Sequence, residues 1–336
     1  MPEPLLDVRD LRVHFPTDDG LVKAVDGVSF SVQPGETLGV VGESGSGKSV
    51  SSLTVMGLVN RKTAQISGEV HFQGQDLLTL PNDEMRTIRG EKISMIFQDP
   101  MTSLHPFYRV GTQIAEAIRE HRKISKKEAH DQAVDMLGKV NIPQPKERAR
   151  QYPHEFSGGM RQRAMIAMAL ALNPDLLIAD EPTTALDVTV QAQILDLIDR
   201  LKEEFNAAVL LITHDLGVVA EHCDTIQVMY AGKIVEVGQT DDLYYRPHHP
   251  YTWGLLNSIP HVAADTDRLQ PIKGMPPSLI NVPPGCAFHP RCPYAFDRCP
   301  AEVPVLTPVD GFHADACFLP LQDKERIVAE EVFTPR

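Results

Sequence analysis

The sequence has no run of about eighteen uninterrupted apolar residues, the minimum that a helix needs to cross a bilayer. Its longest apolar run, Ala164–Leu172, is bounded by Arg163 and by Asn173-Pro174. The first residues also lack the basic start and apolar core of a secretory signal. We therefore expect a cytoplasmic protein, whose role at a membrane, if it has one, comes through a partner.

Positive charge is also scarce, because 32 lysines and arginines stand against 45 acidic residues and give a net charge of −13. General affinity for nucleic acid requires a basic face, so we expect no nucleic-acid partner. The hydrophobic content of 42% and the charged content of 23% are typical of globular proteins and exclude a mainly disordered chain.

Proline is unevenly distributed, since more than half of the 27 prolines lie between Pro247 and Pro335. Proline removes a backbone donor and fixes φ, so this part of the chain is expected to be rich in loops. We predict two domains, a main domain over residues 1–245 and a C-terminal extension over residues 246–336.

The main domain alternates short apolar runs with helical patterns, which indicates an α/β fold with a mainly parallel sheet. Residues 105–175 are mostly helical in pattern and predict an inserted helical subdomain. Ala231-Gly232-Lys233 joins two strand-like runs and predicts a hairpin. The expected strands are Thr37–Val41, Lys92–Phe97, Asp175–Ala179 and Ala208–Thr213, and the expected helices are Lys48–Val59 and Asp187–Glu204.

Gly42 to Ser49 read Gly-Glu-Ser-Gly-Ser-Gly-Lys-Ser, which is the G-x-x-x-x-G-K-[ST] pattern of a phosphate-binding loop between a strand and a helix. Glycines let successive backbone N–H groups converge on phosphate oxygens. We expect Lys48 to reach the β- and γ-phosphates and the Ser49 hydroxyl to bind Mg²⁺.

Two carboxylates, Asp180 and Glu181, follow the apolar strand that begins at Leu176. In a phosphate-binding-loop protein Asp180 is expected to hold Mg²⁺, directly or through water. Glu181 points the other way along an extended chain, toward the position of an attacking water.

Phe156-Ser-Gly-Gly-Met160 comes more than a hundred residues after the phosphate-binding loop. A Ser-Gly-Gly that opens a helix offers N–H groups and a hydroxyl to an anion. With the preceding motifs, this segment resembles the Leu-Ser-Gly-Gly-Gln signature of the ATP-binding cassette (ABC) family. Phe156 and Met160 depart from that signature, while its Ser-Gly-Gly core is retained.

The resemblance covers roughly residues 5–240 and assigns further roles. It implies that Gln98 senses Mg²⁺ and the γ-phosphate, that Asp187 belongs to the D-loop, that His214 is the switch histidine and that Phe15 stacks on adenine. It also implies an antiparallel N-terminal β-subdomain. The implied ATP-binding residues are Phe15, Gly42, Glu43, Ser44, Gly45, Ser46, Gly47, Lys48, Ser49, Val50 and Gln98, with Mg²⁺ held through Ser49, Gln98 and Asp180.

The family geometry implies that two subunits pair head to tail, so that Ser157, Gly158 and Gly159 of one face the ATP of the other. Glu181 and His214 are then the catalytic residues of an ATPase. The implied partners are a second, identical or homologous ATPase subunit, two membrane-spanning permease subunits and, indirectly, an extracytoplasmic solute-binding protein. The chain would lie at the cytoplasmic face of the cell membrane.

Four of the five cysteines crowd the C-terminal extension, at Cys286, Cys292, Cys299 and Cys317. In a cytosolic chain such a cluster favours a metal site over disulfides, although the close C-x2-4-C pairs of structural zinc are missing. The segment from Cys286 to Pro293, together with His249-Pro-Tyr-Thr252, resembles the extension of dipeptide and oligopeptide permease ATPases. That resemblance implies a [4Fe-4S] cluster on the four thiolates. Zinc, and free thiols or a disulfide, are the alternatives, and His289 and His313 are near enough to serve as substitute ligands.

We therefore expect the ATPase subunit of an importer for dipeptides or oligopeptides. One alternative is a soluble ABC-type mechanical ATPase, which usually carries two cassettes or a long coiled-coil insertion. Another is the same type of transporter carrying nickel or a different solute.

Overall fold

The computed structural model describes residues 3–184, 186–258 and 272–332, and the chain divides into two compact units, which are described separately. The helical unit contains residues up to Leu5, Val32–Glu36 and Thr79–Ile212. The P-loop unit contains Leu6–Ser31, Thr37–Leu78 and the chain from Thr213 onward.

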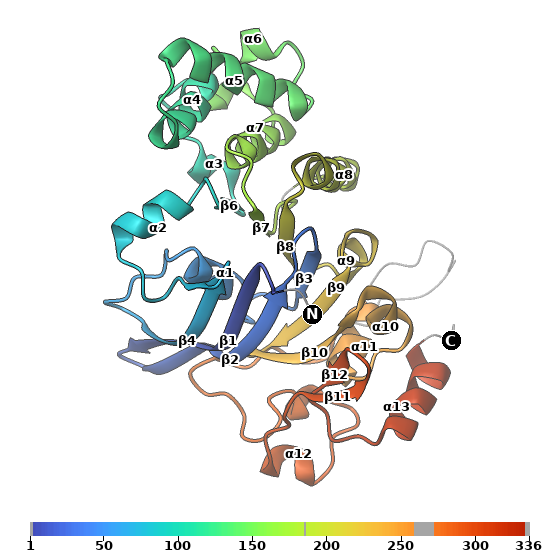
Figure 1. Cartoon of the computed structure of the whole chain (residues 1–336). Helices are drawn as coiled ribbons and strands as arrows, with labels where there is room; N and C mark the ends of the chain where they lie inside the picture. The colour runs from blue at the N-terminus through green and yellow to red at the C-terminus, as the bar shows by residue number, and fades with distance from the viewer. Residues whose placement is uncertain (1–2, 185, 259–271, 333–336) are drawn as a thin grey trace. The chain divides into compact units, whose positions relative to one another are not determined.

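The helical unit combines three parallel strands with a group of helices (Figure 1). Its elements are α2 (Asn82–Ile88), β6 (Ile93–Ile96), α3 (Pro100–Ser103), α4 (Val110–His121), α5 (Lys126–Lys139), α6 (Pro145–Arg148), the 3₁₀ turn η1 (Pro153–Glu155), α7 (Gly158–Leu170), β7 (Leu176–Asp180), α8 (Val188–Phe205) and β8 (Ala208–Thr213). Strand β7 lies between β6 and β8, with Ile93 opposite Leu176 and Asp180 opposite Ile212. All residues of β7 and β8 are buried, which explains their unbroken apolar sequence.

The helices between β6 and β7 occupy most of residues 105–175, and α4, α5 and α7 pack against one another. Helix α5 begins with a capping box, in which Ser125 Oγ accepts from the N–H of Glu128 and the Glu128 carboxylate accepts from the N–H of Ser125. Helix α8 is amphipathic and buries Ile194, Leu197 and Leu201, which lie at helical spacing.

The P-loop unit contains two sheets (Figure 1). Its elements are β1 (Leu6–Thr17), β2 (Gly20–Val32), β3 (Thr37–Val41), α1 (Lys48–Val55), β4 (Gln65–Phe72), β5 (Gln75–Asp76), α9 (Leu216–His222), β9 (Thr225–Tyr230), β10 (Lys233–Gln239), α10 (Thr240–Tyr245), α11 (Pro250–Leu256), the 3₁₀ turn η2 (His289–Arg291), α12 (Arg298–Ala301), β11 (Thr307–Asp310), β12 (His313–Asp315), α13 (Leu321–Ile327) and the π-helical turn η3 (Val328–Val332).

The first sheet has the order β2-β1-β4-β5, with β1 antiparallel to β4 and β4 antiparallel to β5. The second sheet runs β3-β9-β10-β12-β11 within this unit, with β3 parallel to β9 and the other neighbours antiparallel. The predicted hairpin joins β9 to β10, and both turn residues, Ala231 and Gly232, have positive φ as a tight hairpin requires. The predicted α/β class and the antiparallel N-terminal sheet are therefore confirmed.

The helix predicted over Lys48–Val59 was too long, because α1 ends at Val55. Gly57 has a φ of 62° and donates to Thr54 O, while the N–H of Leu58 donates to Leu53 O. This is a Schellman motif, and the glycine in the left-handed region ends the helix.

The C-terminal extension is joined to the second sheet through β12, where Ala314 lies opposite Val237 of β10. A small apolar cluster of Trp253, Ile327 and Val328 adds side-chain packing. The domain boundary near residue 245 stays a prediction. Within residues 3–184, 186–258 and 272–332, no helix combines the length and the apolar character needed to cross a bilayer.

Candidate nucleotide site and cysteine cavity

The predicted phosphate-binding loop runs from the end of β3 into α1, as its sequence pattern requires. Lys48 is buried, and its Nζ donates to Gly42 O at 2.6 Å and to Glu43 O at 3.0 Å. Ser44 and Gly45 are exposed at the tip of the loop. Ser46 Oγ is buried without a hydrogen-bond partner within the described part of the chain, so it is a polar atom that a phosphate oxygen could satisfy.

Two of the loop glycines are required by close backbone approach. A Cβ at Gly47 would lie 2.2 Å from Ala24 O, and the φ of Gly47 is +107°. A Cβ at Gly42 would lie 2.1 Å from Met229 O. The loop is thus fixed by its packing against neighbouring backbone, and its N–H groups keep one arrangement.

Glu181 follows β7 in a left-handed conformation, with a φ of 47° that is unusual for a residue with a side chain. The extended backbone expected at Glu181 was therefore wrong, because β7 ends at Asp180. Its N–H donates to Ile212 O at 2.8 Å. The carboxylate atom Oε2 accepts from Gln98 Nε2 at 2.9 Å and from Thr184 Oγ1 at 2.8 Å. The helical unit therefore brings together two of the predicted site residues, Gln98 and Glu181, whose roles stay predictions. Thr184 was missed although it lies only three residues from Glu181.

Asp180 ends β7 with a buried side chain, in keeping with a carboxylate that holds a cation. A carboxylate, a hydroxyl and an amide oxygen are the ligands that Mg²⁺ prefers, so the chemistry of Asp180, Ser49 and Gln98 fits this ion. Their roles as its ligands stay a prediction.

The predicted signature segment begins α7, with Ser157 as its N-cap. Ser157 Oγ accepts from the N–H of Met160 at 3.3 Å, and Ser157 and Gly158 are exposed. Phe156, which departs from the family signature, is buried. An exposed helix N-terminus with a serine cap is the arrangement that binds an anion.

The remaining predicted residues lie at the ends or edges of elements. Asp187 caps α8 by accepting from the N–H of Val190 at 3.0 Å, and Ala185 of the predicted D-loop lies outside the described residues. His214 directly follows β8 and is exposed, and Phe15 is half-buried in β1. Their predicted contacts with ATP stay predictions.

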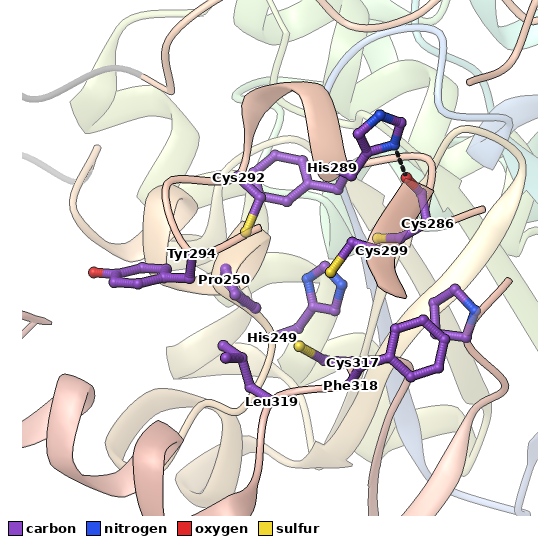
Figure 2. Close-up of a pocket in the computed structure, with 12 residues that line it drawn as sticks. His249, Pro250, Cys286, His289, Cys292, Tyr294, Cys299, Cys317, Phe318 and Leu319 are labelled. Atoms are coloured by element: carbon purple, nitrogen blue, oxygen red, sulfur yellow. Dashed lines mark hydrogen bonds between the residues drawn. The ribbon is translucent and has the colours of Figure 1, made fainter. Parts of the chain in front are cut away.

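All four cysteines of the extension line one cavity of about 20 Å³ (Figure 2). Figure 2 shows their side chains around a common space, with His249 and Leu319 beside them. None of the five cysteines forms a disulfide. Burial raises the pKa of Cys292 to about 12 and that of Cys317 to about 11, so a nearby cation is needed to hold these groups as thiolates.

The two histidines considered as substitute ligands lie in different places. His289 lines the cavity, and its Nδ1 hydrogen-bonds Cys286 O at 2.9 Å. His313 does not line it, because its Nε2 pairs with Glu236 Oε1 at 2.8 Å and its ring stacks on His248. His313 is therefore not a substitute ligand in this arrangement.

Glu236, His248 and His313 bring three potential metal-binding atoms within 4.8 Å of one another. The Glu236 carboxylate already accepts from the N–H groups of His248 and His249 and from His313 Nε2. Burial would raise the pKa of Glu236, but these hydrogen bonds outweigh it and lower the pKa. The two imidazole rings stack with centroids 4.0 Å apart and nearly parallel, an arrangement in which their in-plane nitrogens do not converge on one ion. We interpret this group as a structural hydrogen-bond network.

The strand-loop-helix of the P-loop unit, with Lys48 and its glycines, defines a P-loop nucleotide-binding protein. Residues 25–184 match the family described as ABC transporter, and residues 235–299 match the family described as oligopeptide/dipeptide transporter, C-terminal region. The dimeric structure of the ATP-binding cassette MJ0796 in a post-hydrolysis state bound to ADP and Pi aligns with a TM-score of 0.63 and 26% identity, covering 70% of this chain and 98% of that one.

Curated relatives match nearly the whole chain. The oligopeptide transport ATP-binding protein OppD of Salmonella typhimurium is 52% identical over 96% of this chain and 96% of its own length. The dipeptide transport ATP-binding protein DppD of Bacillus subtilis is 51% identical over 97% of this chain and 98% of its own length. The chain belongs to the ABC transporter family of ATPases, in the group that carries the oligopeptide/dipeptide transporter C-terminal region.

Proposed function

We propose that this chain is the ATP-hydrolysing subunit of an importer for dipeptides or oligopeptides. The support is the similarity to OppD and DppD, which extends through the cysteine-containing extension and not only through the ATPase core. Nickel or another solute, carried by the same type of transporter, is the alternative. A soluble mechanical ATPase is disfavoured, because the extension matches a transporter family.

Glu181 is the proposed general base, and its geometry is the observation that carries the catalytic part of the proposal. Hydrogen bonds from Gln98 and Thr184 fix the carboxylate, and a strained backbone holds the residue at the end of β7. A fixed carboxylate can orient water for in-line attack on the γ-phosphorus and accept its proton. His214 would stabilise charge on the γ-phosphate.

Lys48 and the loop N–H groups would bind the β- and γ-phosphates of ATP, with Mg²⁺ held by Ser49, Asp180 and Gln98. The ion supplies positive charge that offsets the charge on the transferring phosphoryl group. Phe15 would stack on adenine. Glu43, Ser44, Gly45, Ser46, Gly47 and Val50 complete the proposed phosphate-binding segment.

Ser157, Gly158 and Gly159 would bind the γ-phosphate held by a second ATPase subunit, identical or homologous, with Asp187 near the same interface. The exposed N-terminus of α7 and the dimeric structure of the related cassette support this pairing. Two permease subunits would anchor the pair at the cytoplasmic face of the membrane, and a solute-binding protein would deliver the substrate. Purification of this chain from a membrane extract tests the assembly. Integral membrane subunits should co-purify with it, and purified protein without them would contradict the proposal.

Glu181→Gln tests the catalytic role because it keeps the shape of the side chain and its acceptor oxygen while removing the charge. We expect at least a hundredfold loss of ATP hydrolysis with Mg-ATP binding retained. Glu203→Gln is the matched control, since Glu203 is an exposed glutamate of α8. ATP turnover by Glu181→Gln at the wild-type rate would refute the role.

The cysteine cavity fits a metal centre by its donor set, because four sulfur atoms line one small space and form no disulfide. We propose that Cys286, Cys292, Cys299 and Cys317 hold a [4Fe-4S] cluster, with zinc as the alternative. Bound there, the metal would crosslink a loop-rich segment and contribute folding free energy.

Metal analysis of anaerobically purified protein tests this assignment. We expect iron and acid-labile sulfide in equal amounts, and loss of both in the Cys317→Ser variant. Cys223→Ser is the control, because Cys223 does not line the cavity. Zinc without sulfide would reject the cluster, and the absence of any metal would reject the site.

A further inference from the structure

The C-terminal extension holds the phosphate-binding loop at one residue, Glu43. The N–H of Glu43 donates to the Tyr251 hydroxyl at 2.8 Å. The Glu43 carboxylate accepts from both terminal nitrogens of Arg291, at 2.6 Å and 2.9 Å. These partners lie 208 and 248 residues along the chain from Glu43.

Arg291 is fixed in this position by its surroundings. Its side chain is only 5% exposed and lies 5.9 Å from the ring centroids of Tyr230 and Phe288. It also donates to the carbonyl of Lys273 at 3.1 Å and to that of Gly274 at 3.2 Å. A forked, buried guanidinium that binds both carboxylate oxygens sets the orientation of Glu43 as well as its position.

Holding Glu43 also holds the lysine that receives phosphate. Glu43 O accepts from Lys48 Nζ at 3.0 Å and from the N–H of Ser46 at 3.2 Å. The backbone of Glu43, its carboxylate and the Lys48 ammonium group therefore form one hydrogen-bonded set, which Arg291 and Tyr251 anchor from the extension.

Because Glu43 is negatively charged, its ion pair with Arg291 affects nucleotide binding as well as loop geometry. A carboxylate within a phosphate-binding loop repels the anionic triphosphate, and a buried cation that neutralises it removes that repulsion. Arg291 is the residue before Cys292, and Phe288 both packs against Arg291 and lines the cysteine cavity. The turn η2 thus joins the cavity to the loop.

We propose that Arg291 is a positioning residue for the phosphate-binding loop and that it makes ATP affinity depend on the C-terminal extension. Arg291 acts through Glu43, neutralising the carboxylate and fixing the loop turn that carries Lys48. The proposal rests on the proposed function only in that this loop binds ATP.

The test is the dissociation constant for Mg-ATP, measured on the full-length protein for Arg291→Met, Arg291→Lys, Glu43→Gln and the double variant Arg291→Met/Glu43→Gln. We expect Arg291→Met to weaken binding tenfold or more and to raise KM for ATP with kcat nearly unchanged. The Mg-ATP affinity of Arg291→Lys should lie between those of the wild type and Arg291→Met, because an ammonium group keeps the positive charge but cannot bind both carboxylate oxygens as the guanidinium does. Glu43→Gln in the Arg291→Met background should restore most of the affinity, since it removes the uncompensated charge.

Arg298→Met is the matched control, because Arg298 also precedes a cysteine of the extension but pairs with Glu302, at 2.9 Å, instead of with the loop. It should bind Mg-ATP as the wild type does. Unchanged affinity in Arg291→Met would overturn the proposal, and so would a double variant as weak as Arg291→Met, which would indicate general damage. A wild-type protein that fails to bind Mg-ATP would instead refute the nucleotide-binding function itself.

Discussion

The ion pair between Lys324 and Asp315 offers a direct test of how the extension is fastened to the sheet. Lys324 Nζ lies 2.7 Å and 2.8 Å from the two carboxylate oxygens, and the side chains are 4% and 1% exposed. Lys324 belongs to α13 and Asp315 to β12, which pairs with β10. The pair therefore joins the last helix to the sheet.

Lys324→Met would keep most of the apolar stem and remove the charge, leaving Asp315 buried without its cation. Burial already raises the pKa of Asp315, and Lys324 opposes that rise. Breaking a buried pair by removing one partner costs about 3–5 kcal/mol. A cost of about 3 kcal/mol corresponds to roughly a hundredfold rise in the opening constant of this segment.

Native-state hydrogen exchange is the suitable assay, because a chain of this size need not unfold in a single two-state transition. Amides of β12 and α13 should exchange about a hundredfold faster in Lys324→Met, while β7 is unaffected. Asp315→Asn added to Lys324→Met should recover most of the protection, since it removes the buried charge and retains an acceptor for the N–H of Cys317. The exposed Lys127→Met is the control. Unchanged exchange in Lys324→Met would show that the ion pair does not fasten α13 to the sheet.

Two further predictions concern acid stability and the glycine loop. Burial and the nearby His313 lower the pKa of His248 to about 4, so its contribution to stability is complete above its unfolded pKa of about 6.5 and is lost as the pH falls toward 4. The loss is about 3 kcal/mol at most. His248→Gln should reduce, but not abolish, the fall in unfolding free energy over this pH range, because burial also lowers the pKa of His249 to about 4. An unchanged pH profile would contradict the assignment. Gly47→Ala should abolish Mg-ATP binding, because the added Cβ would collide with Ala24 O. The Cβ added in Gly45→Ala meets nothing within 4 Å, so this variant should lose only a modest part of its Mg-ATP affinity, through its positive φ. Equal Mg-ATP affinities of the two variants by calorimetry would contradict the steric argument.

The parts of the fold set by local sequence could be predicted. The strand before the phosphate-binding loop, the buried β7 and the hairpin at Ala231-Gly232 follow from apolar runs and turn residues close together in the chain. The end of α1 was misplaced because the apolar pattern continues past Gly57, whose backbone conformation ends the helix.

The contacts that join the extension to the rest of its unit could not be predicted. β12 forms because β10 offers it an edge for pairing, and β11, which contains Pro308, pairs in turn with β12. The contact of Arg291 with Glu43 spans 248 residues, and a single sequence holds no signal for such a pair. The clustering of the four cysteines in the sequence agrees with their convergence on one cavity. The different places of His289, which lines that cavity, and His313, which pairs with Glu236, required the structure.

The two main proposals are that ATP binds between two ATPase subunits and that Glu181 is the general base for its hydrolysis. The most direct measurement is sedimentation of Glu181→Gln with and without Mg-ATP, beside the same protein carrying Ser157→Arg in the exposed segment before α7. We expect a dimer of Glu181→Gln that forms only with Mg-ATP and is lost with Ser157→Arg. A protein that stays monomeric at saturating Mg-ATP, both alone and mixed with a homologous ATPase subunit, would contradict the proposal, and so would a dimer indifferent to both ATP and Ser157→Arg.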